Sequence, residues 1–293
     1  MATVYRASNT TPVITYQRRS TFPWRVILFY LFIIPLLLVW LVPLFTAIVT
    51  SVRSLDSLVA NGPWSIPTEI EWGNFKEAWT KGGLRHYMAN SFIITIPVLF
   101  GTLLLSSMAA FTLARYKFRG NLLIYFTFVG GTLLPYQILM LPVFRLSNFF
   151  GIYDTYWAPI VFHISFQLGF CTFVLRNFMR TIPGEIFDAA RIDGASEIRI
   201  FGQHVLPLSL PSLAALATLE FTWIFNDYLW ALILIQQDRL KPVTTGLASL
   251  MGEYQRSWNI LFAGTLIAVV PTVLLFVFLQ RFFIQGLTMG SSK

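Results

Sequence analysis

Residues 183–211 read PGEIFDAARIDGASEIRIFGQHVLPLSLP, a charged segment that lies between two long apolar tracts. The segment carries four acidic side chains and two arginines, although only 12% of the 293 residues are charged. Soluble domains usually carry about 25% charged residues, so the chain as a whole departs strongly from that class. A segment this polar has to lie outside the hydrocarbon, and we expect it to have a function of its own there.

The apolar tracts predict an all-α polytopic membrane protein with six kinked transmembrane helices. Each tract has about 20 or more residues, the length that crosses about 30 Å of hydrocarbon as a helix. Helices are required because backbone groups in lipid must find partners within their own segment. Nearly all the tracts contain proline, which favours a bundle of kinked helices around a pathway, although proline is also simply common in membrane helices. The predicted spans are 26–50, 90–114, 121–145, 156–176, 206–235 and 259–281.

The basic residues set the expected orientation. Arg115, Lys117 and Arg119 crowd the short link between the second and third spans, and four arginines precede the first span. Because basic residues concentrate on the cytoplasmic side, we expect both termini and the charged segment to lie in the cytoplasm. The basic residues lie in several places between the apolar tracts, so membrane orientation explains the net charge of +8 better than nucleic-acid binding does. The expected division is a cytoplasmic N-terminal segment (1–25), a six-helix transmembrane domain (26–281) that includes the loop at 177–207, and a cytoplasmic C-terminal tail (282–293).

The charged segment itself predicts two short helices joined at a glycine elbow. Pro183 suits the first turn of a helix, and Asp193-Gly194 ends it because glycine accepts the left-handed conformation. Ser196 can cap a second helix that runs to about His204. Paired charges, apolar contacts and a small alanine pair favour a surface that docks a protein, whereas a membrane-surface helix would be richer in lysine and arginine. A solvated loop that only connects two spans is the alternative.

The order DAARIDGAS…VLPLSLP resembles the EAA loop of the membrane subunits of bacterial ABC importers. Asp188, Ala189 and Ala190 occupy the E-A-A positions, and Gly194 occupies the glycine position that follows. Two residues depart from the family pattern, since Asp188 replaces the usual glutamate and His204 replaces the usual isoleucine.

Four further fragments resemble the carbohydrate-uptake branch of this family, in the same order along the chain. They are NSFIITIP at 90–97, ARYKFRGN at 114–121, FNDYLWALI at 225–233 and QRFFIQGLTMG at 280–290. Phe225 replaces a frequent tryptophan before the Asn-Asp pair. The last fragment resembles the C-terminal tail of the maltose-type permease subunit, which implies that Gln285 and Gly286 contact the ATPase subunits.

The resemblance implies that the charged segment is a coupling-helix loop seated in a cleft of a cytoplasmic ATPase subunit. It also implies a second, homologous and usually different permease subunit, two ABC ATPase subunits that bind ATP and Mg, and a soluble solute-binding protein. The implied location is the bacterial cytoplasmic (inner) membrane. The chain itself is expected to bind no cofactor and not to be an enzyme, because none of its lysines follows a glycine as a Walker nucleotide loop requires. The residues implied in coupling are Asp188, Ala189, Ala190, Arg191, Asp193 and Gly194.

The fifth predicted span holds the candidate pathway for a di- or oligosaccharide. Glu220 and Asp227 are costly against lipid, so we expect them to face the interior of the bundle. Their spacing places them on one helix face with Trp223 and Trp230. Carboxylates and the amide of Asn226 bond sugar hydroxyls, and indole faces pack against the C–H surface of a sugar ring.

Each of these assignments has an alternative. Glu220 and Asp227 could bond neighbouring helices, Trp230 could belong to an interfacial aromatic belt, and His163, four residues from Gln167, more often bonds another helix than lines a polar route.

A competing function is an ion-coupled secondary transporter with Glu220 and Asp227 as proton sites, although paired broken helices are not evident. A membrane-embedded enzyme ranks last, because the three histidines are far apart and no metal-ligand spacing is present. The acidic pair disfavours an anionic substrate, but the identity of the sugar stays open.

Overall fold

The computed structural model describes residues 24–62, 65–67, 69–253 and 257–289, and all the regular secondary structure in those ranges is helical. This agrees with the all-α prediction. The chain divides into two units, Met1–Phe45 and Thr46–Lys293, and each is described by itself. Most of the predicted N-terminal segment lies outside the described residues.

In the first unit the described residues form the greater part of helix α1 (Trp24–Ser51), which ends in the second unit. Its 28 residues, at 1.5 Å each, extend about 42 Å, which is enough to cross a bilayer. Apolar side chains cover all sides of the helix, as expected for a helix in lipid, and Pro35 and Pro43 lie inside it.

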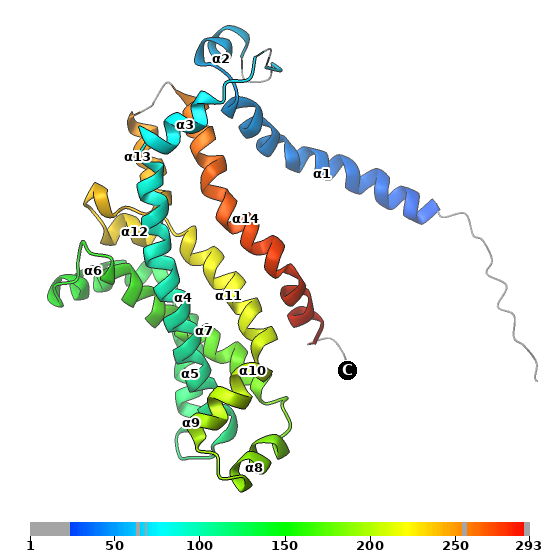
Figure 1. Cartoon of the computed structure of the whole chain (residues 1–293), viewed down its shortest axis with the longest axis vertical. Helices are drawn as coiled ribbons and strands as arrows, with labels where there is room; N and C mark the ends of the chain where they lie inside the picture. The colour runs from blue at the N-terminus through cyan, green and yellow to red at the C-terminus, as the bar shows by residue number, and fades with distance from the viewer. Residues whose placement is uncertain (1–23, 63–64, 68, 254–256, 290–293) are drawn as a thin grey trace, which may run out of the picture. The chain divides into compact units, whose positions relative to one another are not determined.

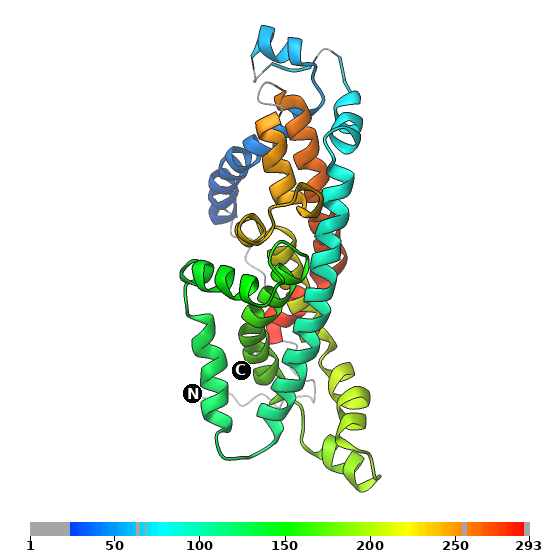
Figure 2. The same ribbon diagram turned by 90° about the vertical axis from the view of Figure 1, so that its left-hand side faces the viewer.

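The second unit is built around two long helices that pack side by side, α4 (Leu84–Arg115) and α7 (Trp157–Met179). Helix α5 (Asn121–Thr132) packs on α7. Helix α11 (Leu210–Phe225) packs on both α4 and α14 (Trp258–Met289). Figures 1 and 2 show these helices in two perpendicular views.

The third predicted span, 121–145, is not one continuous helix. After α5 ends at Thr132, the 3-10 turn η1 (Tyr136–Leu139) and helix α6 (Met140–Phe149) continue at an angle of 91° to it. Pro135 lies in the break and has no backbone N–H to continue the helical ladder. Figure 2 shows α6 lying across the direction of α5.

The fifth predicted span, 206–235, is also broken. Helix α10 (Leu206–Leu208) continues the helical run that precedes it, and α11 turns from that run by 74°. Helix α11 ends at Phe225, and a short helix α12 (Leu229–Leu234) follows. By length and composition, four described helices, α1, α4, α7 and α14, can each cross a membrane, and up to six spans result if each bent pair is one span.

The predicted connectors 51–89 and 236–258 contain short helices of their own. Helices α3 and α13 lie at one end of α4, and the charged segment 183–211 lies at the other end (Figure 1). The long helix α4 therefore connects the two ends of the second unit. The connector helices are α2 (Leu55–Asn61), α3 (Gly73–Thr80), η3 (Asp238–Leu240) and α13 (Val243–Glu253).

Candidate functional site

The charged segment folds into two short helices that meet at a glycine, as the sequence predicts. Helix α8 (Glu185–Ile192) ends before Gly194, which has φ +78°, a left-handed conformation that glycine adopts without steric cost. Helix α9 (Glu197–Ile200) begins at Ser196, whose hydroxyl oxygen accepts a backbone N–H of the first turn. We call residues 185–200 the elbow.

Two details of this segment differ from the prediction. Helix α8 starts after Pro183 with Gly184 at its N-cap, so the proline precedes the first turn instead of lying in it. The second helix does not end near His204, because the π-helical turn η2 (Phe201–Val205) carries it into α10. The elbow is therefore continuous with the bent helix pair that leads into α11.

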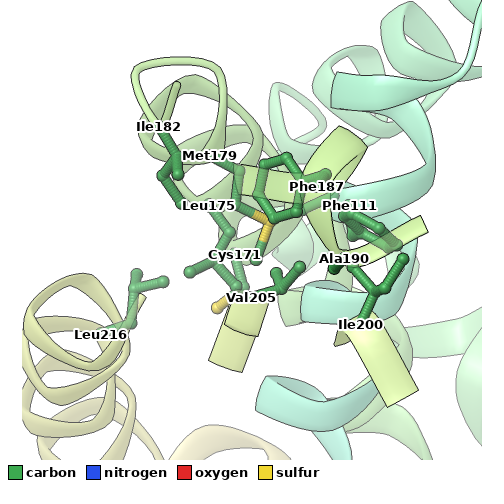
Figure 3. Close-up of a cluster of buried hydrophobic side chains, with 11 residues drawn as sticks. Phe111, Cys171, Leu175, Met179, Ile182, Phe187, Ala190, Ile200, Val205 and Leu216 are labelled. Atoms are coloured by element: carbon green, nitrogen blue, oxygen red, sulfur yellow. The ribbon is translucent and has the colours of Figure 1, made fainter. Parts of the chain in front are cut away.

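The inner face of the elbow belongs to the hydrophobic core of the second unit. Phe187 and Ala190 of α8 are only 2% and 6% exposed, and they belong to one buried cluster with Phe111 of α4 and Leu175 of α7. Figure 3 shows these side chains converging from separate helices. The small side chain of Ala190 thus serves packing within the chain, whereas Ala189 is exposed.

The outer face of the elbow carries two isoleucines that contact little of the chain. Ile192 is 86% exposed and Ile198 is 85% exposed. Burying a side chain of this kind contributes about 1.5–3 kcal/mol, so a partner that covered both would gain considerable binding free energy. Two large apolar side chains on an otherwise charged segment favour an interaction surface.

Ion pairs hold α8 and α9 in place at the elbow. Arg191 donates through Nη1 to Asp188 Oδ1 and through Nε to Glu197 Oε1, each at 2.9 Å. The hydroxyl of Tyr116, the residue after α4, also donates to Glu197. The hydrogen bond to Glu197 raises the pKa of Arg191 further above its ordinary value, at which a guanidinium is already charged at neutral pH. Exposed ion pairs contribute only about 0–1 kcal/mol each, so this network mainly defines the geometry of the elbow.

A single arginine joins the elbow to the two long helices. Arg115, the last residue of α4, donates through Nη2 to the backbone oxygens of Met179 and Ile182, each at 2.5 Å. The central carbon of its guanidinium lies 4.5 Å from the centre of the Phe187 ring. The side chain therefore satisfies one carbonyl at the C-terminal end of α7 and one in the turn that follows it, and it covers a buried ring of α8. From the sequence alone, Arg115 indicates only the orientation of the chain, because its spacing does not distinguish it from the neighbouring basic residues Lys117 and Arg119.

The second candidate site is a cavity of about 430 Å³ between α7 and the two bent spans. Small-ligand sites usually have volumes of roughly 300–1,000 Å³, so the cavity is large enough for a small ligand. Its walls come from the end of α5, from η1, from one face of α7, and from both sides of the break between α11 and α12. The lining residues are Thr132, Tyr136, Phe162, His163, Phe166, Gln167, Phe170, Trp223, Asp227 and Trp230.

Four of the six residues predicted for the substrate pathway line this cavity, namely His163, Trp223, Asp227 and Trp230. The Trp230 ring centre lies 3.7 Å from that of Phe162, and Trp230 is only 3% exposed. Trp223 is 46% exposed, so much of its indole is free to contact another molecule. The cavity thus combines an aromatic wall with a few polar groups.

Asp227 occupies the break between α11 and α12 and explains why the chain turns there. Its carboxylate accepts the backbone N–H groups of Trp230 and Ala231, at 3.4 and 3.1 Å, which satisfies free donors at the start of α12. The Nε2 atom of His163 lies 3.6 Å from its Oδ2 atom. The hydroxyl of Thr244 donates to the backbone oxygen of Asp227. The side chain that faces the cavity therefore also holds the helix break.

Glu220 and Asn226 do not line the cavity. Glu220 is fully buried, and Cys171 Sγ donates to its Oε1 atom at 3.2 Å. Asn226 donates to the hydroxyl oxygen of Thr272 on α14 at 3.4 Å. A single polar stripe would need an unbroken helix through residue 230, and α11 ends at Phe225, so the predicted stripe does not form.

The predicted ATPase-contacting tail begins as a continuation of α14, which extends to Met289. Gln285 and Gly286 lie in this part of the helix. The side chains of residues 281–289 and the whole of residues 290–293 lie outside the described residues. The contact of Gln285 and Gly286 with an ATPase therefore stays a prediction.

Residues 101–289 match a family described as the binding-protein-dependent transport system inner membrane component. The arabinooligosaccharides transport system permease protein AraQ of Halalkalibacterium halodurans is 37% identical over 254 residues, which cover 86% of this chain and 90% of that protein. The melibiose/raffinose/stachyose import permease protein MelC of Bacillus subtilis is 30% identical over 253 residues, which cover 86% of this chain and 91% of that protein.

Solved structures show the same fold. A chain of a bacterial ABC transporter involved in the import of the acidic polysaccharide alginate has a TM-score of 0.79 at 19% identity, over 93% of this chain and all of that chain. A structure of the bacterial alginate ABC transporter with an alginate pentasaccharide-bound periplasmic protein has a TM-score of 0.64 at 15% identity, over 88% of this chain and 94% of that chain. Because the family match covers more than half of the chain and both relatives align along most of it, this chain belongs to the family of binding-protein-dependent transport system inner membrane components.

Proposed function

We propose that the chain is one of two permease subunits of an ATP-driven importer that carries a di- or oligosaccharide into a bacterial cell. The permease component of this family is not itself an enzyme, and we assign ATP and Mg to separate ATPase subunits. The similarity to two sugar permeases over most of the chain supports the substrate class. Neither the family nor these relatives support the ion-coupled alternative with Glu220 and Asp227 as proton sites.

In the proposed assembly, this chain pairs with a second, homologous but different permease subunit in the bacterial cytoplasmic (inner) membrane. Both termini and the elbow lie in the cytoplasm, where two ABC ATPase subunits bind, and Gln285 and Gly286 provide a second contact with them. A soluble solute-binding protein docks on the other side, against the connector 51–89. A chain of the alginate ABC transporter has a fold similar to that of this chain, and that transporter is solved in complex with a periplasmic protein, which supports a solute-binding partner.

The observation that carries the proposal is the two-sided structure of the elbow. Its inner face is held in the core through Phe187 and Ala190, and its outer face exposes Ile192 and Ile198. Close-packed interiors transmit displacement, so an ATPase subunit that moves the outer face also moves the helices packed on the inner face. The exposed residues that we assign to coupling are Asp188, Ala189, Arg191, Asp193 and Gly194.

The cavity is the part of the substrate pathway that we assign to this subunit. Trp223 presents an exposed indole, and Asp227 and His163 present polar atoms close to it in the same cavity. Aromatic faces and a few polar groups are the usual elements of a small-ligand site. We assign Glu220 and Asn226, which lie outside the cavity, to contacts between helices.

The proposal predicts that uptake requires both ATP and the solute-binding protein. The complete importer is placed in liposomes with its receptor, and labelled arabinooligosaccharides and raffinose serve as trial substrates. Uptake of at least one of them should need enclosed ATP and should stop when a non-hydrolysable analogue replaces it. Uptake driven by a proton gradient in the absence of ATP would contradict the proposal.

A further inference from the structure

The charges around the cavity restrict the sugars that it can hold. Among the described residues that line it, there is no lysine or arginine, and Asp227 is the one carboxylate. With His163 neutral the lining carries a single negative charge, and with His163 protonated it carries none, so in neither state is it positive. With His163 neutral, an anionic sugar would find no cationic partner here, and a protonated His163 would already be paired with Asp227, whose Oδ2 atom lies 3.6 Å from Nε2. Sugar hydroxyls would find the carboxylate of Asp227, the imidazole of His163 and the amide of Gln167.

The negative charge of Asp227 is fixed in position. The backbone N–H groups of Trp230 and Ala231 donate to the carboxylate, at 3.4 and 3.1 Å, so turning it away from an approaching anion would break both hydrogen bonds. The side chain of Asp227 is only 14% exposed, so water and salt screen its charge incompletely.

The aromatic wall suits the apolar faces of a sugar ring. Trp230 packs on Phe162, and the partly exposed Trp223 lies with its ring centre 5.3 Å from that of Phe170. Rings of this kind cover C–H surfaces but offer nothing to an ionised carboxyl group. Burying a carboxylate without a cationic partner is far more costly than burying a hydroxyl group that finds a hydrogen bond.

We propose that this cavity is a binding subsite for an uncharged sugar ring and that Asp227 is the specificity-determining residue that excludes anionic sugars such as uronates. The inference rests on the proposed function, because it concerns a sugar that passes through the permease. The alginate transporter has a similar fold but imports an acidic polysaccharide, so the fold does not decide the charge of the substrate.

The sign of the charge in the cavity can be measured without knowledge of the natural substrate. Thr132→Cys places a thiol on the cavity wall with little change in size, and the natural Cys171 is fully buried. The complete importer is treated with two methanethiosulfonates, one with a cationic trimethylammonioethyl group and one with an anionic sulfonatoethyl group. Labelling of this chain is measured by mass spectrometry. Each labelling rate is divided by the rate at which the same reagent reacts with 2-mercaptoethanol, which corrects for the different reactivities of the two reagents.

We expect the cationic reagent to react about tenfold faster than the anionic one after this correction, because a fixed charge in a partly water-excluded cavity concentrates its counter-ion. Asp227→Asn should remove most of this preference. The remote change Glu77→Gln, at a half-buried position of α3 outside the cavity lining, should leave it unaltered. A preference for the anion, or a cation preference that Asp227→Asn does not reduce, would overturn the inference. Variants are compared only if the partner subunits co-purify with them. Gln167→Cys provides a second position for the thiol on the cavity wall.

A second readout uses sugars directly. D-glucose and D-glucuronate differ only at C6, and each is added during labelling of Thr132→Cys with the uncharged methyl methanethiosulfonate. Glucose should slow labelling about twofold, as expected near half occupancy, at a concentration at which glucuronate has no effect. Equal protection by both sugars, stronger protection by glucuronate, or protection by neither would overturn the inference.

The two proposals fail in different ways. An importer with ATP-driven uptake that lacks these preferences contradicts the charge selection and leaves the proposed function intact. A cavity with these preferences, in an assembly that shows no ATP-driven uptake, contradicts the proposed function and not the charge selection.

Discussion

Replacing Arg115 by methionine is expected to lower ATP-driven uptake at least about tenfold while the assembled importer still hydrolyses ATP. Methionine keeps the apolar part of the side chain but removes the donors to Met179 and Ile182 and the cation above Phe187. A hydrogen bond from a charged group contributes about 1.5–3 kcal/mol, and a cation–π contact contributes about 0.5–2 kcal/mol. A loss of only about 1.4 kcal/mol lowers the equilibrium constant for the correctly seated elbow tenfold.

The measurement is the number of ATP molecules hydrolysed for each sugar transported, which should rise in Arg115→Met because the elbow moves without moving α4. Arg119→Met is the matched control, since Arg119 lies four residues further on in the link that follows α4, carries the same charge and is exposed. Its uptake should stay within about twofold of the wild type, as for most surface changes. Lysine at position 115 should restore only part of the uptake, because it lacks the planar group that reaches two carbonyls and covers a ring. Equal losses in the two methionine variants would contradict a specific role of Arg115.

Gly194→Val is expected to reduce ATP-driven uptake about as strongly as Arg115→Met does. The cause here is the backbone conformation alone. Gly194 has φ +78°, and a Cβ atom there would meet no atom within 4 Å, so crowding is not involved. The left-handed conformation costs a residue with a Cβ atom about 1–2 kcal/mol, and a β-branched residue is a marked outlier there. The turn between α8 and α9 should therefore change, and with it the surface offered to the ATPase subunit.

Two variants isolate this backbone effect. Gly194→Asn should keep most of the uptake, because asparagine tolerates the left-handed region. Gly184→Val should also keep it, since Gly184 has φ −64° and equally open surroundings. ATP-driven uptake and recovery of the ATPase subunits with the permease are measured for each variant. Uptake and ATPase recovery at the wild-type level in Gly194→Val would show that the left-handed turn of the elbow is not required for coupling.

The elbow could be predicted from sequence because its signals are local. Gly194 ends one helix and Ser196 begins the next through properties of the single residues. The bends of the spans could not be predicted, because proline has no unique effect on a membrane helix. Pro97 lies inside the continuous helix α4, whereas Pro135 lies at a break of 91°. Packing against neighbouring helices decides between these outcomes.

For the cavity, the sequence predicted the kinds of residue but not how they come together. Trp223 and Asp227 meet His163 because α11 ends at Phe225 and the Asp227 carboxylate caps the helix that follows. Glu220 lies before the break in α11, and its carboxylate accepts a hydrogen bond from Cys171 of α7 instead of lining the cavity. The contacts of Arg115 were missed for a related reason, because their acceptors lie 64 and 67 residues further along the chain.

Photo-cross-linking from the outer face of the elbow tests most directly whether an ATPase subunit docks there. A benzoylphenylalanine is placed at Ile192 or Ile198 in the complete importer, and at Val59, which is 79% exposed on α2, as the control. Docking predicts that both elbow positions cross-link to the ATPase subunit and that position 59 does not. Cross-links from the elbow only to lipid or to the solute-binding protein, with the ATPase present in the purified importer, would contradict it.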